Sequence, residues 1–314
     1  MRDAFAGPWR RGAFAEITPE ELRRVGWFRP HHGVVCWGGV DRDDPMTRIR
    51  AAAEAQHGVP LGTWAAAYLL GARSLDGVAL DGRTALDVVF CPGTSGRRRR
   101  RPGLVPLRSP LTEDDVVTVD GVLVTSAVRT AFDLGRTATD LYSAVADLDA
   151  LLRALRTPVE ELEQYTAERP GWKGVPLLRE ALSLLDPRAR SRPESRMRVV
   201  WVKDAALPRP EVNVETRSTA DGVLLGIPDL LDLESGLVGE YDGAEHRRVT
   251  QHGADNIREE AFEEQGLTVV RAIWDDVLRR RGLARRLRDG YERARRGQRR
   301  TWYVPPSQLR RAAP

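Results

Sequence analysis

Two strand-like segments, residues 227–232 and 237–242, are joined by the short turn at residues 233–236. If the hairpin is centred between Glu234 and Ser235, residues whose numbers sum to 469 face each other, so Asp229 opposes Glu240. Directly opposed β-carbons lie about 4.5–5.5 Å apart on one face of a sheet. Because side chains alternate along a strand, Asp242 shares the face of Glu240. The spacing therefore predicts three carboxylates gathered on one face of a hairpin.

Carboxylates this close repel one another unless a cation or a proton compensates, and the predicted face holds no Lys or Arg between them. Oxygen-only ligands suit a hard ion such as Mg²⁺ or Mn²⁺. We therefore predict that Asp229, Glu240 and Asp242 bind a metal ion. The alternative is an exposed acidic hairpin that faces water. Asp232 has the opposite parity and Glu234 lies in the turn, so both are predicted to be solvated.

The elements around this hairpin predict an α/β domain. A helix over about 192–206 is followed by strands, a polar helix over about 255–265, another strand and a last helix that ends near Arg296. Ser191 and Glu194 have the spacing of a capping box, in which the Glu194 carboxylate accepts from the Ser191 amide. A place for Glu194 in the metal site is the second interpretation, and the two do not exclude each other.

Five motifs follow one another in this region. They are Ile227-Pro228-Asp229, Glu240-Tyr241-Asp242-Gly243, His246, Asp255-Asn256-Ile257-Arg258 and the run from Gly266 to Arg271. In this order they resemble the PD-(D/E)XK endonucleases, and in particular the group related to very-short-patch-repair endonucleases, over about residues 190–280. The resemblance implies a restriction-endonuclease-like fold, a mixed sheet flanked by helices. It also implies Mg²⁺- or Mn²⁺-dependent hydrolysis of phosphodiester bonds in DNA.

The same resemblance implies a role for each matching residue. Asp229 and Glu240 would hold the metal, Asp242 would bind it or orient the attacking water, and Glu194 would match the acidic residue of the first helix. His246 would exchange a proton, or it caps the hairpin. Arg258 and Arg271 would neutralise the phosphate, although Arg258 has the spacing of a surface ion pair with Asp255. Asp242 replaces the lysine that gives the motif its name, which leaves the general base open.

The N-terminal half carries a second resemblance. The runs GVVCWGG, residues 33–39, and VTSAVRTAFDL, residues 124–134, resemble AbiEi-like antitoxins of type IV toxin–antitoxin systems. Those proteins begin with a winged helix-turn-helix. Here one clear helix, over 18–26, precedes the first run, so the resemblance implies an α+β region after a shortened winged-helix-like start. Arg129 and Asp133, four residues apart on one helix, are predicted to form a structural ion pair.

This second resemblance gives the alternative function. The chain would be a non-catalytic DNA-binding regulator or an antitoxin-like protein that keeps a nuclease fold. Its partners would then be DNA and a toxin, or a repair protein.

Arginines dominate the C-terminal part of the chain. From Arg271 to Pro314 there are fourteen arginines against four acids, a local excess of +10. Such an excess favours a nucleic-acid partner. The chain has just two lysines, so an arginine-rich codon usage explains part of it. The run that includes Arg97, Arg98 and Arg99 is predicted either to contact a nucleic-acid backbone or to be a solvated loop.

Composition sets the remaining expectations. We predict a shortened winged-helix-like and helical region at 1–75, an α+β region at 76–186, a nuclease-like domain at 187–296 and a basic tail at 297–314. No apolar run approaches the roughly 20 residues needed to span a bilayer. Residues 1–14 lack the apolar core of a signal peptide, and two cysteines imply no disulfide framework. These features predict a cytoplasmic protein without a membrane partner.

Overall fold

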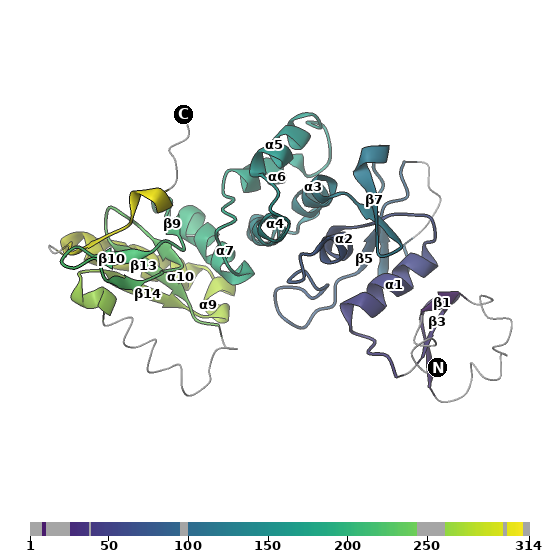
Figure 1. The fold of residues 1–314 in the computed structure, drawn as a ribbon, viewed down its shortest axis with the longest axis horizontal. Coiled ribbons are helices and arrows are strands. Elements are labelled where there is room, and N and C mark those ends of the chain that lie inside the picture. The colour runs from purple at the N-terminus through teal and green to yellow at the C-terminus, as the bar shows by residue number, and fades with distance from the viewer. Residues whose placement is uncertain are drawn as a thin grey trace. The chain divides into compact units, whose positions relative to one another are not determined.

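The computed structural model describes residues 8–10, 26–37, 39–94, 100–243, 261–297 and 300–309. Contacts divide the chain into two compact units (Figure 1). Unit 1 comprises Met1–Ala138 and Leu151–Arg179, and unit 2 comprises Thr139–Ala150 and Glu180–Pro314. The chain thus enters unit 2 for twelve residues, returns to unit 1, and then completes unit 2. The predicted boundaries at 75, 186 and 296 stay predictions.

Unit 1 begins with a three-stranded antiparallel sheet in the order β1-β3-β2. Its strands are β1 (Trp9–Arg10), β2 (Trp27–His31) and β3 (Val34–Trp37). Helix α1 (Pro45–Ala55) follows, and the Asp44 side chain caps it by accepting from the Thr47 amide at 2.7 Å. The helix predicted over 18–26 lies outside the described residues, so the shortened winged-helix start stays a prediction.

A five-stranded mixed sheet forms the centre of unit 1, in the order β6-β5-β4-β8-β7. Its strands are β4 (Leu61–Gly62), β5 (Val88–Phe90), β6 (Leu104–Pro106), β7 (Val116–Val119) and β8 (Val122–Thr125). Strands β7 and β8 form a hairpin in which Asp120 and Gly121 both have positive φ, as a tight two-residue turn requires. Leu61 and Gly62 pair with Phe90 and Val89, and α2 (Thr63–Leu70) begins directly after them.

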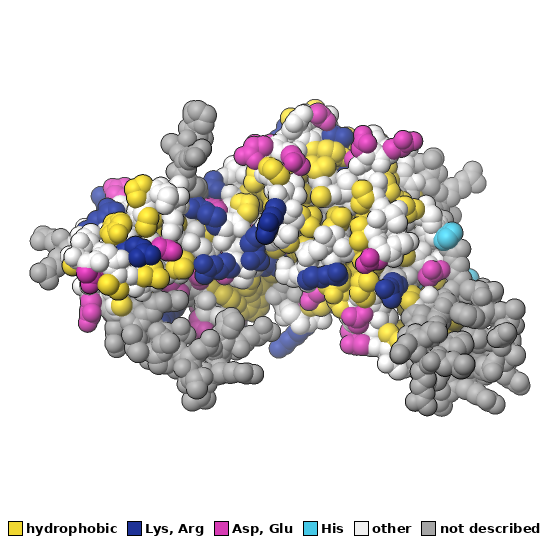
Figure 2. Space-filling view, viewed as in Figure 1, with side chains coloured by type: hydrophobic (Ala, Val, Ile, Leu, Met, Phe, Trp, Pro, Cys, Tyr) yellow, Lys and Arg dark blue, Asp and Glu magenta, His cyan; other side chains and the backbone are white. Residues whose placement is uncertain are grey.

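Helices α3 (Ala127–Thr137), α4 (Leu141–Leu155), α5 (Val159–Ala167) and α6 (Val175–Leu182) follow this sheet. Ser126 is the N-cap residue of α3, but its hydroxyl makes no capping bond. Its carbonyl accepts the first hydrogen bond of the helix, from the Thr130 amide at 2.7 Å. Helix α5 has Glu160 and Glu161 in its first turn, where the helix dipole favours acids, and acidic side chains gather over it in the space-filling view (Figure 2).

Unit 2 contains a four-stranded mixed sheet in the order β14-β13-β12-β9, and a three-stranded sheet in the order β11-β10-β15. Strands β12 and β13 are antiparallel, and β13 and β14 are parallel. The elements are α7 (Arg192–Val199), a π turn (Val200–Asp204), β9 (Glu211–Val212), β10 (Thr216–Ser218), β11 (Leu224–Gly226), β12 (Leu230–Leu231), β13 (Leu237–Tyr241), β14 (Thr268–Ala272), α9 (Trp274–Leu278), α10 (Arg281–Arg296) and β15 (Trp302–Tyr303). The predicted mixed α/β architecture is confirmed, and its assignment to the restriction-endonuclease fold stays a proposal.

Glycines let helices α7 and α10 lie close to the four-stranded sheet. A β-carbon at Gly239 of β13 would lie 2.8 Å from the Met197 side chain of α7. One at Gly290 of α10 would lie 2.8 Å from the Val270 side chain of β14. Val238, on the opposite face of β13, belongs to a second apolar cluster with Phe262 and Trp302. The sheet is therefore buried on both faces where the candidate hairpin crosses it.

Two ion pairs join residues 139–150 to α7, one of them partly buried and the other fully buried. Asp147 accepts from Arg192 at 2.6 Å, and Asp149 pairs with Arg198, both side chains being 1% exposed. A domain that began at residue 187 would lack both acidic partners.

Residues 297–314, predicted to be a basic tail, include the short strand β15. Trp302 and Val304 are 3% and 7% exposed, and β15 pairs with β10 through Arg217 and Ser218. Both apolar side chains belong to a buried cluster of unit 2. None of the described helices is long and apolar enough to cross a bilayer.

Candidate functional site

The β12–β13 hairpin has the predicted register. Leu230 pairs with Gly239 and Leu231 with Val238, and the Asp232 amide donates to the Leu237 carbonyl at 2.9 Å. The same register continued by one residue sets Asp229 opposite Glu240. The Tyr241 amide donates to Asp229 Oδ2 at 2.7 Å, which fixes this carboxylate to the end of β13.

The predicted charge balance of this face changes once β14 is included. In the parallel β13–β14 pair, Glu240 lies directly beside Arg271. Partners in register point to the same face, so a guanidinium accompanies the carboxylates. A metal ion is then no longer the only cation that can offset their repulsion. The pairing of β13 with β14, which brings Arg271 beside Glu240, could not be seen from the hairpin sequence alone.

The described side chains do not assemble the predicted metal ligands. Among the described ranges, no three His, Cys, Asp or Glu side chains form a group that could hold a metal ion. Glu240 is 8% exposed, whereas Asp242 is exposed just beyond β13. Asp229 Oδ2 is already engaged by an amide. A divalent cation bound here would need ligands beyond those that the described residues bring together.

Glu194 lies at the N-terminus of α7 and is 8% exposed. Ser191 Oγ accepts from the Glu194 amide at 3.3 Å, which is one half of the predicted capping box. The other half differs, because Glu194 Oε2 accepts from the amide of Arg190 at 2.8 Å and not from that of Ser191. The cap is therefore shifted by one residue.

Asn213 connects Glu194 to the hairpin. Its Nδ2 donates to Glu194 Oε2 at 3.1 Å and to the Arg188 carbonyl at 3.0 Å, while its amide donates to the Asp229 carbonyl at 3.2 Å. Asn213 has φ of 50°, in the left-handed region that Asn tolerates better than most residues. The sequence alone predicted no role for Asn213, although an Asn between Val212 and Val214 interrupts an apolar alternation.

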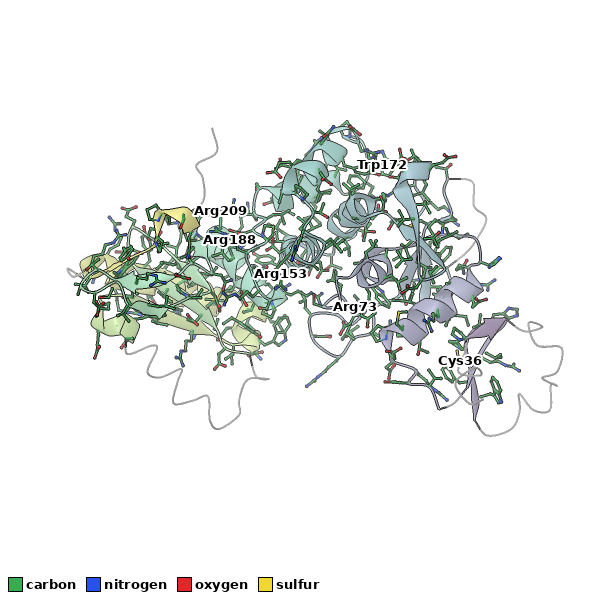
Figure 3. All side chains as sticks on the ribbon, in the orientation of Figure 1. Cys36, Arg73, Arg153, Trp172, Arg188 and Arg209 are labelled. Carbon is green, nitrogen blue, oxygen red and sulfur yellow. The ribbon has the colours of Figure 1, made fainter. Side chains whose placement is uncertain are left out.

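A cleft of about 540 Å³ opens beside Asn213. Its walls include Arg188, Arg190, Glu215, Ile227 and Gln308. Arg188, labelled in Figure 3, is held by Asp186 and Glu211 at 2.9 Å each and donates to the Gln308 carbonyl at 3.1 Å. The C-terminal segment thus forms one wall of the cleft.

The structure tests two further predictions, and others concern residues that it does not describe. Asp232 was predicted to be solvated, but it is 4% exposed because its Oδ2 accepts from the amide and the hydroxyl of Ser235, both at 2.7 Å. Glu234 is exposed, as predicted. Tyr241, whose side chain alternates with that of Glu240 along β13, is half-buried. His246, Arg258, Arg97, Arg98 and Arg99 lie outside the described residues.

Unit 1 contains a buried ionic network around Arg129. Arg129 Nε donates to Asp133 Oδ2 at 2.8 Å, and both side chains are 0% exposed, which confirms the predicted ion pair. Asp115 accepts from Arg129 at 3.1 Å. Burial opposes ionisation of Arg129, but the two carboxylates outweigh it and raise the pKa of the guanidinium. The network is therefore charged and internally compensated.

Aromatic rings and further donors enclose this network. Tyr165 donates to Asp115 Oδ1 at 2.6 Å, and burial together with this bond raises the pKa of Tyr165 to about 12. Arg129 and Arg136 each lie 5.3 Å from the ring centroid of Trp172, labelled in Figure 3. Arg136 also reaches Asp133 at 2.6 Å. The side chains of Arg129, Asp133 and Asp115 thus find their partners inside the unit, as a structural network requires.

Comparison with known proteins gives one family match and two similar relatives. Residues 35–184 match the family described as AbiEi antitoxin C-terminal domain, which includes the Arg129 network. Two uncharacterized proteins of Mycobacterium tuberculosis, MT2308 of strain CDC 1551 / Oshkosh and Rv2248 of strain H37Rv, are 34% identical over 179 residues. The alignment covers 56% of this chain and 65% of each relative. No solved structure matches.

These comparisons support the AbiEi-like resemblance and do not support the nuclease one. The matched segment ends before Glu194 and the hairpin. The family match therefore does not bear on the predicted nuclease residues.

Proposed function

We propose that this chain is an antitoxin-like protein that counteracts a partner toxin, as in a type IV toxin–antitoxin system. The match of residues 35–184 to the AbiEi antitoxin C-terminal domain carries the proposal. The alternative that the sequence left open is thus favoured over the nuclease interpretation.

The chemistry of the matched segment supports this choice. Five of its buried polar residues bond to one another within the unit: Ser109, Asp115, Arg129, Asp133 and Arg136. A site for acid–base chemistry needs groups within reach of a substrate, and these side chains are at most 8% exposed. Such a network stabilises a scaffold that presents its surface to a macromolecule.

Growth rescue tests the proposal. The chain and each protein encoded beside its own gene would be expressed from separate inducible promoters. We expect one neighbouring protein to arrest growth, and co-expression of the chain to restore it. Rescue should persist in the Asp229→Asn/Glu240→Gln variant, because the proposed role needs no catalysis. A chain that rescues none of the toxic neighbours would refute the proposal.

A metal-dependent DNA endonuclease is the second candidate. It rests on the hairpin register, which sets Asp229 opposite Glu240, and on Asn213, which links Glu194 to Asp229. Purified chain would be incubated with supercoiled plasmid and with short single-stranded, duplex and mismatched DNA, in Mg²⁺, Mn²⁺ or EDTA. Cleavage that needs the metal and disappears in Asp229→Asn would establish this activity. Cleavage that survives in both Asp229→Asn and EDTA would identify a contaminant.

A further inference from the structure

Helix α10 has two chemically distinct faces. Leu283, Leu287, Gly290 and Ala294 are buried, and the helix packs on β14. Successive residues turn by about 100°, so positions spaced by four and three residues share a face. Arg281, Arg285 and Arg288 have this spacing, and all three are exposed. They form a row, here called the α10 arginine row, opposite the buried face.

The α10 arginine row disfavours the helix that carries it. Arg281 stands at the first helical position, where a cation opposes the helix dipole. Like charges four and three residues apart on the same face also repel one another. Arginines that weaken their own helix indicate a role outside it.

Other arginines nearby are neutralised, which sets the row apart. Arg279 pairs with Asp275 at 3.2 Å, and Arg286 pairs with Asp276 at 2.7 Å. Within the described chain, Arg281 and Arg285 make no ion pair, and Arg288 donates to the Asp204 carbonyl at 2.9 Å. Glu292 lies on the same face and offsets charge towards the C-terminal half. The N-terminal half of α10 is therefore the most positive part.

We propose that the α10 arginine row binds the phosphate backbone of double-stranded DNA. The row spans about 10 Å at the helical rise of 1.5 Å per residue, which brings three guanidinium groups to neighbouring phosphates. Guanidinium groups suit phosphate because their donors form a fixed fork. Helix α10 contains seven arginines in all, including the row, and two acids. Its net charge of +5 attracts a polyanion. This surface lies outside the antitoxin-like segment, so its role does not depend on the function proposed above.

Salt-dependent binding tests the proposal. Full-length wild type and Arg281→Gln/Arg285→Gln/Arg288→Gln would be titrated against a fluorescein-labelled DNA duplex at several salt concentrations. Loss of three phosphate contacts should flatten the log–log slope by about 2.7, at 0.9 for each contact. The thermal midpoint of the variant should stay equal or rise, because the substitutions remove unfavourable charge from α10. Weaker binding then reports a lost contact and not a lost fold.

A charge-matched variant completes the design. Arg50→Gln/Arg83→Gln/Arg153→Gln removes the same charge from exposed positions of unit 1. We expect its slope to match that of the wild type. Equal slopes for both variants, or no duplex binding by the wild type, would overturn the proposal. The growth-rescue experiment is read separately, so failure of one proposal leaves the other distinguishable.

Discussion

A β-carbon at Gly174 would lie 1.8 Å from the carbonyl oxygen of Arg136. Gly174 also has φ of 84°, a left-handed conformation that residues with a side chain rarely adopt. The loop between α5 and α6 therefore touches the backbone of α3 directly. This contact places Trp172 and Lys173 against the Arg129 network, where the Lys173 carbonyl accepts from Arg136 at 3.4 Å.

Gly174→Ala should destabilise the chain by more than about 2 kcal/mol, since left-handed strain alone costs about 1–2 kcal/mol and the backbone must also move. Urea unfolding followed by circular dichroism would measure the loss. Gly171→Ala is the matched control in the same loop, because a β-carbon there meets nothing within 4 Å. Equal losses at the two positions would contradict the close approach.

Arg129→Met should lower the free energy of unfolding by about 3–5 kcal/mol, because it leaves Asp115 buried without its cation and leaves Asp133 with Arg136 alone. The exposed pair of Arg100 with Asp87, at 3.1 Å, provides the comparison. Arg100→Met should change stability by at most about 1 kcal/mol. Chemical denaturation of both variants and of Arg129→Met/Asp133→Leu would measure the coupling. If Arg129→Met costs no more than Arg100→Met, the network is not what stabilises unit 1.

Asn213→Asp should be more destabilising than Asn213→Gly. In the native chain Asn213 Nδ2 donates to Glu194 Oε2 at 3.1 Å and to the Arg188 carbonyl. A carboxylate at this position cannot donate, so both acceptors lose their donor and Glu194 faces a second negative charge. Glycine loses the same bonds, but it relieves the strain of φ at 50°. Thermal melts at neutral and mildly acidic pH would separate them. Acid should narrow the gap, because protonation turns the introduced carboxyl into a donor; a gap that widens in acid would be inconsistent with this geometry.

Cys91 should resist alkylation in the folded chain. Burial raises the pKa of its thiol to about 12, while the thiolate is the reactive form. The unfolded thiol ionises near 8.5, so the unfolded state releases the proton first as the pH rises. The free energy of unfolding should therefore fall above about pH 8.5, until the folded pKa is reached, and Cys91→Ala should remove that part.

Iodoacetamide labelling with and without urea, followed by mass spectrometry of the Cys91 peptide, would test the burial directly. We expect Cys91 to be alkylated only when urea is present. Rapid labelling of the folded chain would show that the thiol is accessible.

The hairpin register was predictable because side chains alternate with a fixed period and the turn is short, so Leu230 and Gly239 could be paired from the sequence. The place of Arg271 beside Glu240 was not. It depends on a parallel pairing between strands separated by more than twenty residues, which no local pattern specifies. Asn213 was passed over because a single left-handed residue interrupts an otherwise regular alternation.

The sequence pattern also did not predict which side chains are buried. Asp232 has the polarity of a surface residue, and its bonds to Ser235 are what allow it to be buried. Trp302 follows a run of arginines, yet it completes the core of unit 2. In both cases the decisive partner lies in the folded chain and not in the residue type.

Helix α4 contributes its first ten residues to unit 2 and its last five to unit 1. Recombination at the end of the antitoxin-like segment would therefore not transfer a complete module. A gene fragment beginning after residue 184 would encode Arg192 and Arg198 without Asp147 and Asp149. During synthesis, the acidic partners leave the ribosome about fifty residues before their arginines. Helix α7 therefore needs residues from both sides of position 184 to compensate the charge of its buried arginine.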